Sequence, residues 1–243
     1  MLTTYSLKMP HAVYGGENAM DNITAILKAN GVKRVAMFTD KGIEGAGLFA
    51  LPEEAVKASG ADYYVLDDLP AEPSYMAVQK LVDQFKASGA DMIVACGGGS
   101  VMDAAKLASV LVTDEYGVKE LLDNPGMAQK CVPIVLIPTT AGTGSETTIA
   151  AVVTDENHHK YAVNDLCLIP RWAILDPTLT VSLPAGVTAE TGLDALTHAV
   201  EAYIGRSTTK ETRACAIEAV DLIRRYLKLA YDEPRNQEAR TAM

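Results

Sequence analysis

The sequence is poor in cysteine, in positive charge and in long apolar runs, and each shortage excludes a class of protein. Four cysteines among 243 residues form no CxxC pair, so neither a zinc ribbon nor a disulfide framework is predicted. The formal net charge of −10 argues against nucleic acid and anionic membranes as partners. No apolar run approaches the roughly 18 residues of a membrane-spanning helix, and the first residues lack the regions of a secretory signal. We therefore expect a cytoplasmic protein that binds small molecules.

Short apolar runs alternate with helical patterns over the first half of the chain. Hydrophobic residues make up 49% of the sequence, enough for one large α/β domain and part of a second. The predicted strands span residues 34–39, 63–66, 91–96 and 133–137. The helical patterns between them span residues 18–30, 74–88 and 101–112. Strands joined through helices predict a parallel sheet with helices on both faces.

The pattern changes after residue 137. A β-hairpin is predicted next, and its strands and turn span residues 147–154, 160–163 and 155–159. Long helical patterns follow over residues 186–204 and 208–231. We therefore place an α/β domain at residues 1–180 and the beginning of an all-helical domain at residues 181–243.

Three consecutive glycines open the segment GGGSVMDAAK, residues 97–106, where a predicted strand passes into a predicted helix. Glycines let backbone amides approach an anion that any Cβ would keep away, so the segment is a candidate pyrophosphate site. The alternative is a tight turn followed by a capping box of Ser100 with Asp103, which needs no ligand. The spacing differs from the GxGxxG of common dinucleotide folds, and the segment alone leaves both interpretations open.

A second loop of small residues, PTTAGTGSE at residues 138–146, follows the next predicted strand. Both loops are therefore expected at the carboxyl edge of the sheet, where open α/β sheets bind ligands. Asp40 ends the strand predicted at residues 34–39 and is placed to accept hydrogen bonds from ribose hydroxyls and to repel a 2′-phosphate. Its alternative role is to cap a turn or helix. Together these features predict a nucleotide cleft.

Asp194 and His198 stand four residues apart in a helical pattern, so their side chains leave one helix face together. Such a pair offers half of the ligand shell of a divalent metal, which needs about two more protein ligands. The alternative is an ordinary pair on a helix surface. The other histidines do not complete the shell: His11 lies in the N-terminal segment, and His158 and His159 lie in the polar turn.

Six ordered blocks of this sequence together resemble the iron-dependent (group III) alcohol dehydrogenase family. They are residues 10–16, 39–42, 97–106, 138–146, 175–177 and 192–203. The resemblance implies a Rossmann-like NAD(P)-binding domain followed by an all-helical metal-binding domain, an architecture similar to that of dehydroquinate synthase. It implies hydride transfer between NAD(P) and a small alcohol or aldehyde, with Fe²⁺ as the metal and Zn²⁺ or Mn²⁺ as alternatives.

The resemblance also implies the residues of two sites. The cofactor contacts would be Asp40, Gly97, Gly98, Gly99, Ser100, Asp103, Thr139, Thr140, Thr143, Lys160 and Leu179. The metal ligands would be Asp194 and His198. No separate catalytic nucleophile is expected, because the metal polarises the substrate oxygen.

Two departures from the family pattern stand out. Glu72-Pro73-Ser74 replaces the usual Asn-Pro-Thr, and the chain ends at Met243, before the helices in which the family carries two further histidine ligands. We therefore expect the front part of a longer enzyme. The alternatives are an NAD-binding fragment without activity, or a glycerol dehydrogenase or dehydroquinate synthase-like enzyme of the same fold. A homodimer that pairs through residues 1–16 as an edge strand is a further expectation.

Overall fold

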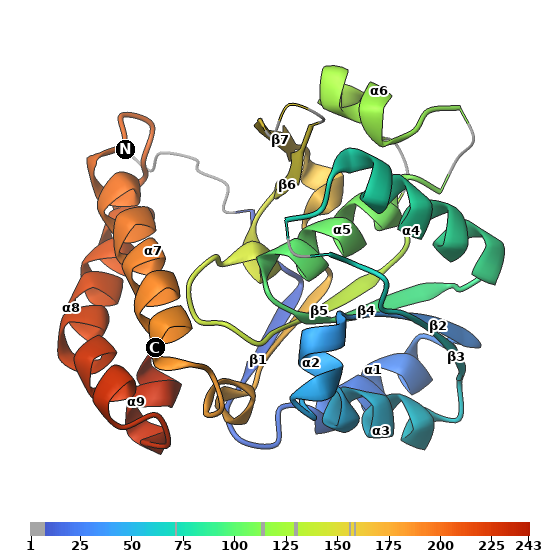
Figure 1. Ribbon diagram of the computed structural model, residues 1–243. Helices are drawn as coiled ribbons and strands as arrows, with labels where there is room; N and C mark the ends of the chain where they lie inside the picture. Colours follow the sequence, from blue (N-terminus) through green and yellow to red (C-terminus); the bar gives the residue numbers. More distant parts are fainter. Residues whose placement is uncertain (1–7, 71, 113–114, 129–130, 156, 158) are drawn as a thin grey trace, which may run out of the picture. The chain divides into compact units, whose positions relative to one another are not determined.

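The computed structural model describes residues 8–70, 72–112, 115–128, 131–155, 157 and 159–243. These residues form two compact units (Figure 1). The larger unit comprises Lys8–Thr139 and Ser145–Leu175, and the smaller unit comprises Thr140–Gly144 and Asp176–Met243.

A six-stranded sheet with the order β1-β8-β5-β4-β2-β3 forms the centre of the larger unit. Its strands are β1 Ala12–Gly15, β2 Arg34–Phe38, β3 Asp62–Leu66, β4 Met92–Gly97, β5 Ile134–Pro138 and β8 Trp172–Leu175. All five pairings between neighbouring strands are parallel. The prediction of a parallel α/β sheet is confirmed, and each of the four predicted strands is found within one residue of its expected limits.

Helices cover both faces of this sheet (Figure 1). The helices of the larger unit are α1 Asp21–Ala29, α2 Lys41–Gly45, α3 Ala50–Ser59, α4 Tyr75–Ser88, α5 Gly99–Val110 and α6 Val118–Asp123, with the short helices η1 Pro125–Met127, η2 Ser145–Thr147 and η3 Leu166–Leu168. Local signals fix their ends. The Ser74 hydroxyl accepts a hydrogen bond from the Ala77 amide at the start of α4, and Gly89 ends that helix with a φ of 65°, which glycine adopts without a steric cost.

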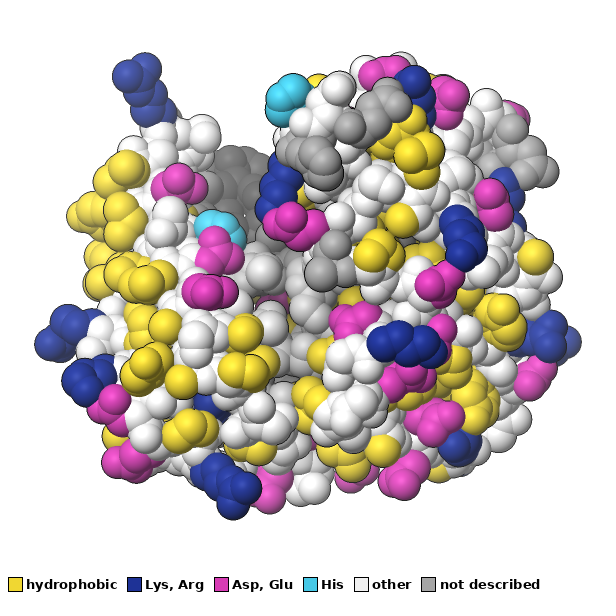
Figure 2. Space-filling view, in the orientation of Figure 1, with side chains coloured by type: hydrophobic (Ala, Val, Ile, Leu, Met, Phe, Trp, Pro, Cys, Tyr) yellow, Lys and Arg dark blue, Asp and Glu magenta, His cyan; other side chains and the backbone are white. Residues whose placement is uncertain are grey.

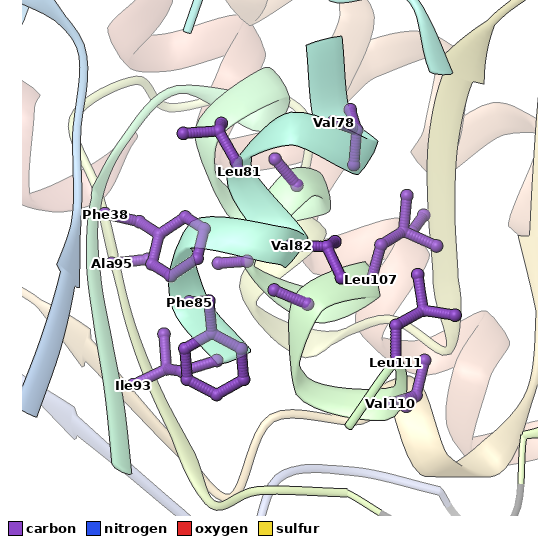
Figure 3. Packing of buried hydrophobic residues seen from close by; sticks show 14 of the residues in the cluster. Phe38, Val78, Leu81, Val82, Phe85, Ile93, Ala95, Leu107, Val110 and Leu111 are labelled. Atoms are coloured by element: carbon purple, nitrogen blue, oxygen red, sulfur yellow. The ribbon is translucent and has the colours of Figure 1, made fainter. Parts of the chain in front are cut away.

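The main core lies between the sheet and the helices α4 and α5. Figure 3 shows Phe85 of α4 near Phe38 of β2, and their rings lie 6.2 Å apart. Val82 precedes Phe85 by one turn of α4. All three residues are at most 2% exposed. The strands β4 and β5 are buried along their whole length, as expected for strands covered on both faces.

The predicted hairpin is present as β6 Ala150–Thr154 and β7 Lys160–Asn164, paired antiparallel. Its first predicted residue, Thr147, ends η2 instead, and β6 begins three residues later than expected. The far end of β6 is tied to the loop before α4, because Thr154 forms a parallel bridge with Ser74.

The smaller unit is helical. It contains η4 Pro177–Thr180, α7 Ala185–Ile204, α8 Lys210–Asp232 and α9 Gln237–Ala242, and α7 and α8 begin and end within two residues of their predicted limits. Figure 2 shows hydrophobic side chains gathered on the surface of these helices. Leu193, Ile204 and Ile217 of this unit are all more than half exposed. Among the described helices, none is both long and apolar enough to cross a membrane.

Candidate cofactor site and metal ligands

The loops predicted to bind a nucleotide meet at the carboxyl edge of the sheet. β4 and β5 are neighbours, with Gly97 in register with Pro138. The Thr139 amide donates a hydrogen bond of 3.0 Å to the Gly97 carbonyl, so the beginnings of both loops are joined. Asp40 follows β2, the neighbour of β4 on the other side. The sheet order therefore places these segments where open α/β sheets bind their ligands.

The glycine segment opens helix α5 without a side-chain cap. Gly98 is the N-cap residue and has no side chain to satisfy the first amides of the helix, which leaves these donors, at the positive end of the helix dipole, for an anion. Gly97 is needed for packing as well, because a Cβ there would lie 2.7 Å from the Val101 Cβ. The three glycines therefore combine a close helix–strand contact with an open helix N-terminus.

The capping box of Ser100 with Asp103, the ligand-free alternative, is wrong. The Asp103 carboxylate instead accepts hydrogen bonds from the Ser145 hydroxyl at 2.6 Å and from the Val152 amide at 2.9 Å. Burial raises the pKa of this carboxyl, against the lowering effect of these two donors. Asp103 thus connects the first turns of α5 to η2 and β6.

Two buried hydroxyls at this edge find no hydrogen-bond partner within the described part of the chain. They are the Oγ1 atoms of Thr39 and Thr139, and each residue is only 1% exposed. A buried polar atom without a partner costs about 1–3 kcal/mol, so both hydroxyls indicate a ligand. Thr139 was predicted as a contact, whereas Thr39 was not. Thr39 lies directly after a buried strand and before Asp40, and this position could have indicated Thr39 as a contact.

Asp40 caps a helix, as its alternative interpretation held. Its Oδ1 atom accepts a hydrogen bond of 2.9 Å from the Ile43 amide, at the start of α2. Its contact with a ribose stays a prediction. Burial, with a smaller contribution from the Asp40 charge, raises the pKa of the Cys96 thiol in β4 to about 12. That cysteine is therefore a neutral thiol at neutral pH and no nucleophile.

Lys160 forms an ion pair that the sequence did not predict. Its Nζ lies 3.1 Å from the Glu72 Oε1, and both side chains are more than half exposed. Glu72 belongs to the segment that departs from the family pattern, and Lys160 opens β7. The proposed cofactor contact thus already has an acidic partner.

A buried lysine holds the start of β6 against α5. Lys106 has no exposed surface, and its Nζ donates to the Thr148 Oγ1 at 2.9 Å and to the Ala150 carbonyl at 2.8 Å. Burial lowers the pKa of Lys106 to about 8, although the nearby Asp103 and Glu146 carboxylates act to raise it. Burial also raises the pKa of Glu146. The sequence segment contains Lys106, but no role was predicted for it.

In the smaller unit, Asp194 and His198 lie on one face of α7. The Asp194 Oδ1 and the His198 Nε2 are 3.5 Å apart, and both side chains are about half exposed. A carboxylate oxygen and an imidazole nitrogen so placed fit two positions of a divalent metal shell. The described residues include no cluster of three or more such ligands, so the pair provides half a site.

The other predicted contacts in this unit are Thr140, Thr143 and Leu179. The Thr140 hydroxyl is a further buried atom for which the described residues provide no partner. Thr143 belongs to a loop packed tightly on α7, where a Cβ on Gly142 would lie 2.4 Å from the Thr191 carbonyl oxygen. Leu179 is fully buried in η4. Their roles toward a cofactor stay predictions.

The remaining histidines lie where the sequence placed them, as far as they are described. His159 is in the hairpin turn, with its Nδ1 3.6 Å from the Asp155 Oδ2, and is mostly exposed. His11 is exposed beside β1. His158 lies outside the described residues.

Comparison with known proteins tests the resemblance. The family model described as "Iron-containing alcohol dehydrogenase" matches residues 10–177, and the model described as "Fe-containing alcohol dehydrogenase family, C-terminal" matches residues 188–243. The NAD-dependent methanol dehydrogenase of Bacillus methanolicus is 37% identical over 236 residues, 97% of this chain and 62% of that protein.

Solved structures of similar proteins agree with these sequence matches. A 1,3-propanediol oxidoreductase matches with a TM-score of 0.93 at 32% identity, over 99% of this chain and 63% of the other. A sulfoacetaldehyde reductase from Bifidobacterium kashiwanohense in complex with NAD⁺ matches with a TM-score of 0.89 at 30% identity, over 100% of this chain and 64% of the other. The chain thus spans 62% to 64% of the length of these three proteins. It belongs to the iron-containing alcohol dehydrogenase family.

Proposed function

We propose that this chain provides the cofactor-binding part and two metal ligands of an NAD(P)-dependent alcohol dehydrogenase or aldehyde reductase. The observation that carries the proposal is the uncapped N-terminus of α5 beside the partnerless hydroxyls of Thr39 and Thr139. Amide donors at a helix N-terminus suit a pyrophosphate, and the two hydroxyls suit the neighbouring polar atoms of a dinucleotide. The NAD-dependent methanol dehydrogenase and the reductase solved with NAD⁺ support NAD as this cofactor.

The proposed contacts follow the geometry of the sheet edge. The first amides of α5, at Gly98–Val101, bind the pyrophosphate. Asp40 accepts hydrogen bonds from the adenosine ribose and thereby favours NAD over NADP. Lys160 contacts the second ribose. The further cofactor contacts that we propose are Gly97, Asp103, Thr139, Thr140, Thr143 and Leu179.

The proposed metal ligands are Asp194 and His198. When bound, a divalent ion such as Fe²⁺ or Zn²⁺ would supply Lewis acidity toward the oxygen of a small alcohol or aldehyde. The Asp194 carboxylate also supplies negative charge that favours a cation. Two protein ligands hold a divalent ion less firmly than the usual three or four, so we expect weak metal retention by this chain.

The domain assignment and the cellular setting belong to the same proposal. We assign residues 1–180 to the NAD(P)-binding domain and residues 181–243 to the helical metal-binding domain. Four cysteines that form no disulfide favour a reducing compartment such as the cytoplasm. β1, at one edge of the sheet, offers a strand edge through which two copies could pair as a homodimer, and light scattering measures that state.

The test combines binding, metal content and turnover under anaerobic conditions. NADH binding is followed by its fluorescence, and NADH oxidation is followed with short aldehydes, with and without added Fe²⁺ or Zn²⁺. Asp194→Ala and His198→Ala should lower the bound metal and leave NADH binding intact. Asp232→Ala, which removes an exposed carboxylate paired with Lys228 on α8, is the matched control and should change neither.

Each outcome separates the alternatives. Metal-dependent turnover means that the described ligands suffice or that another subunit adds to them. NADH binding without metal or turnover favours a cofactor-binding fragment. That alternative is supported by the presence of only two metal ligands among the described residues. Loss of NADH binding in both alanine variants would mean that the pair is structural, and absence of NADH binding in the unaltered chain would refute the proposal.

A further inference from the structure

The loop before α4 is held across the end of the hairpin in an unusual conformation. The Thr154 amide donates a hydrogen bond of 3.4 Å to the Pro73 carbonyl, and Ser74 forms a parallel bridge with Thr154. The preceding residue, Glu72, has a φ of 52°. This left-handed region is unfavourable for a residue with a long side chain, so the surrounding contacts impose the conformation.

The conformation brings the Glu72 carboxylate to Lys160. The two side chains are exposed by 75% and 63%, and their charged atoms lie 3.1 Å apart. Exposed ion pairs contribute little to stability, because water screens them and ordering two long side chains costs entropy. Stability therefore does not account for a strained acidic residue at this position.

The pair lies at the hairpin that contacts helix α5. Lys160 is the register partner of Thr154 at the end of the hairpin. Two residues earlier on β6, about 7 Å away along a strand, the Val152 amide donates to the Asp103 carboxylate in the first turns of α5. A lysine side chain spans most of such a distance, and the N-terminus of α5 is where the cofactor phosphates are proposed to lie.

We propose that Glu72 sets the cofactor affinity of this chain by competing with the dinucleotide for Lys160. The inference rests on the proposed function. With Glu72 in place, cofactor binding must break the ion pair and bring phosphate charge close to a carboxylate. The result is a weaker, salt-dependent affinity and faster release of the cofactor.

Glu72→Gln tests this directly, because it keeps the shape of the side chain and removes its charge. Two phosphate charges about 7–10 Å from a carboxylate in a water-like medium predict NADH binding about fivefold tighter at low salt. The gain should fall toward none at high salt, because exposed charges are then screened. Glu72→Asn should bind NADH as tightly as Glu72→Gln, because it also removes the charge and asparagine adopts the left-handed region more readily.

Two controls separate this competition from a general charge effect. Glu53→Gln on α3 removes the same charge and also breaks a partly exposed ion pair, with Lys57, and should leave the dissociation constant unchanged. In a Lys160→Met background, Glu72→Gln should produce much less than its fivefold gain, because the competition requires the lysine. Far-UV circular dichroism checks that all variants are folded.

The measurement is the NADH dissociation constant of each variant, from fluorescence titration at low and high salt. Tighter binding by Glu72→Gln that depends on Lys160 supports the inference. Equal or weaker binding by Glu72→Gln, in a set where the unaltered chain binds NADH, overturns this inference alone. Absence of NADH binding in the unaltered chain and in both Glu72 variants overturns the proposed function and this inference with it.

Discussion

Lys106 provides the sharpest test of the energetics of this fold. Burial lowers its pKa from 10.5 to about 8, so the folded chain releases a proton between these values while the unfolded chain still holds it. The unfolded state then binds more protons, and the free energy of unfolding contributed by this group rises as the pH rises from about 8 to about 10.5. At lower pH, burial of the charged amine costs about 3 kcal/mol.

Lys106→Met removes the titrating amine and keeps the length and much of the volume of the side chain. Between about pH 7.5 and about pH 9.5, the unaltered chain should gain roughly 2 kcal/mol of unfolding free energy relative to the variant. The raised pKa of Cys96 acts in the opposite direction above its unfolded value of 9.0, because the unfolded thiol then loses its proton first. Both chains contain Cys96, so its effect cancels in the difference.

Urea unfolding followed by tryptophan fluorescence measures this difference. The chain has one tryptophan, Trp172, which is 5% exposed in β8 and reports on the unit that contains Lys106. A reducing agent keeps the thiols free. Lys80→Met, at an exposed position on α4, is the control and should show no such rise with pH. A difference between the unaltered chain and Lys106→Met that stays constant over this pH range would refute the reasoning.

Three glycine substitutions test how tightly the site is built. Gly97→Ala places a Cβ 2.7 Å from the Val101 Cβ and should destabilise the larger unit by about 1–3 kcal/mol and weaken NADH binding; unchanged urea unfolding and NADH titration would contradict this. Gly142→Ala places a Cβ 2.4 Å from a backbone oxygen of α7, which cannot rotate away. Gly192→Ala meets only side-chain atoms of Leu227, which can change rotamer, and gains about 1 kcal/mol of helix propensity. Circular dichroism melting should therefore show a larger loss for Gly142→Ala than for Gly192→Ala, and the reverse order would be evidence against the packing described.

The sheet could be predicted where burial left a strong local signal. β2, β4 and β5 are covered on both faces and therefore read as continuous apolar runs. β1 and β8 were not predicted, because each has only four residues. β1 pairs only with β8, about 160 residues away, and β8 lies between β1 and β5. Short strands of this kind are specified by tertiary pairing rather than by a local pattern.

The site was predictable only as far as its signals were local. Glycines after a strand and an aspartate four residues from a histidine are visible in the sequence. The capping box was wrong for the converse reason: Ser100 and Asp103 have the right local spacing, but Asp103 binds groups on Ser145 and Val152, which lie 42 and 49 residues away. No spacing rule contains such partners.

The polar network that Lys106 of α5 forms with Thr148 and Ala150 fixes the geometry of the site more than it stabilises the fold. Because the pKa of Lys106 is about 8, its amine is mostly charged at neutral pH. Its two hydrogen bonds then contribute about 1.5–3 kcal/mol each, which serves mainly to offset the roughly 3 kcal/mol lost by burying the charged amine. An apolar side chain would avoid that loss, but it would give up the donors that fix Thr148 and the Ala150 carbonyl. The same helix presents its open N-terminus to the proposed pyrophosphate. Removing Lys106 should therefore disturb NADH binding more than folding at neutral pH, and a Lys106→Met variant that binds NADH normally would show that the network is structural alone.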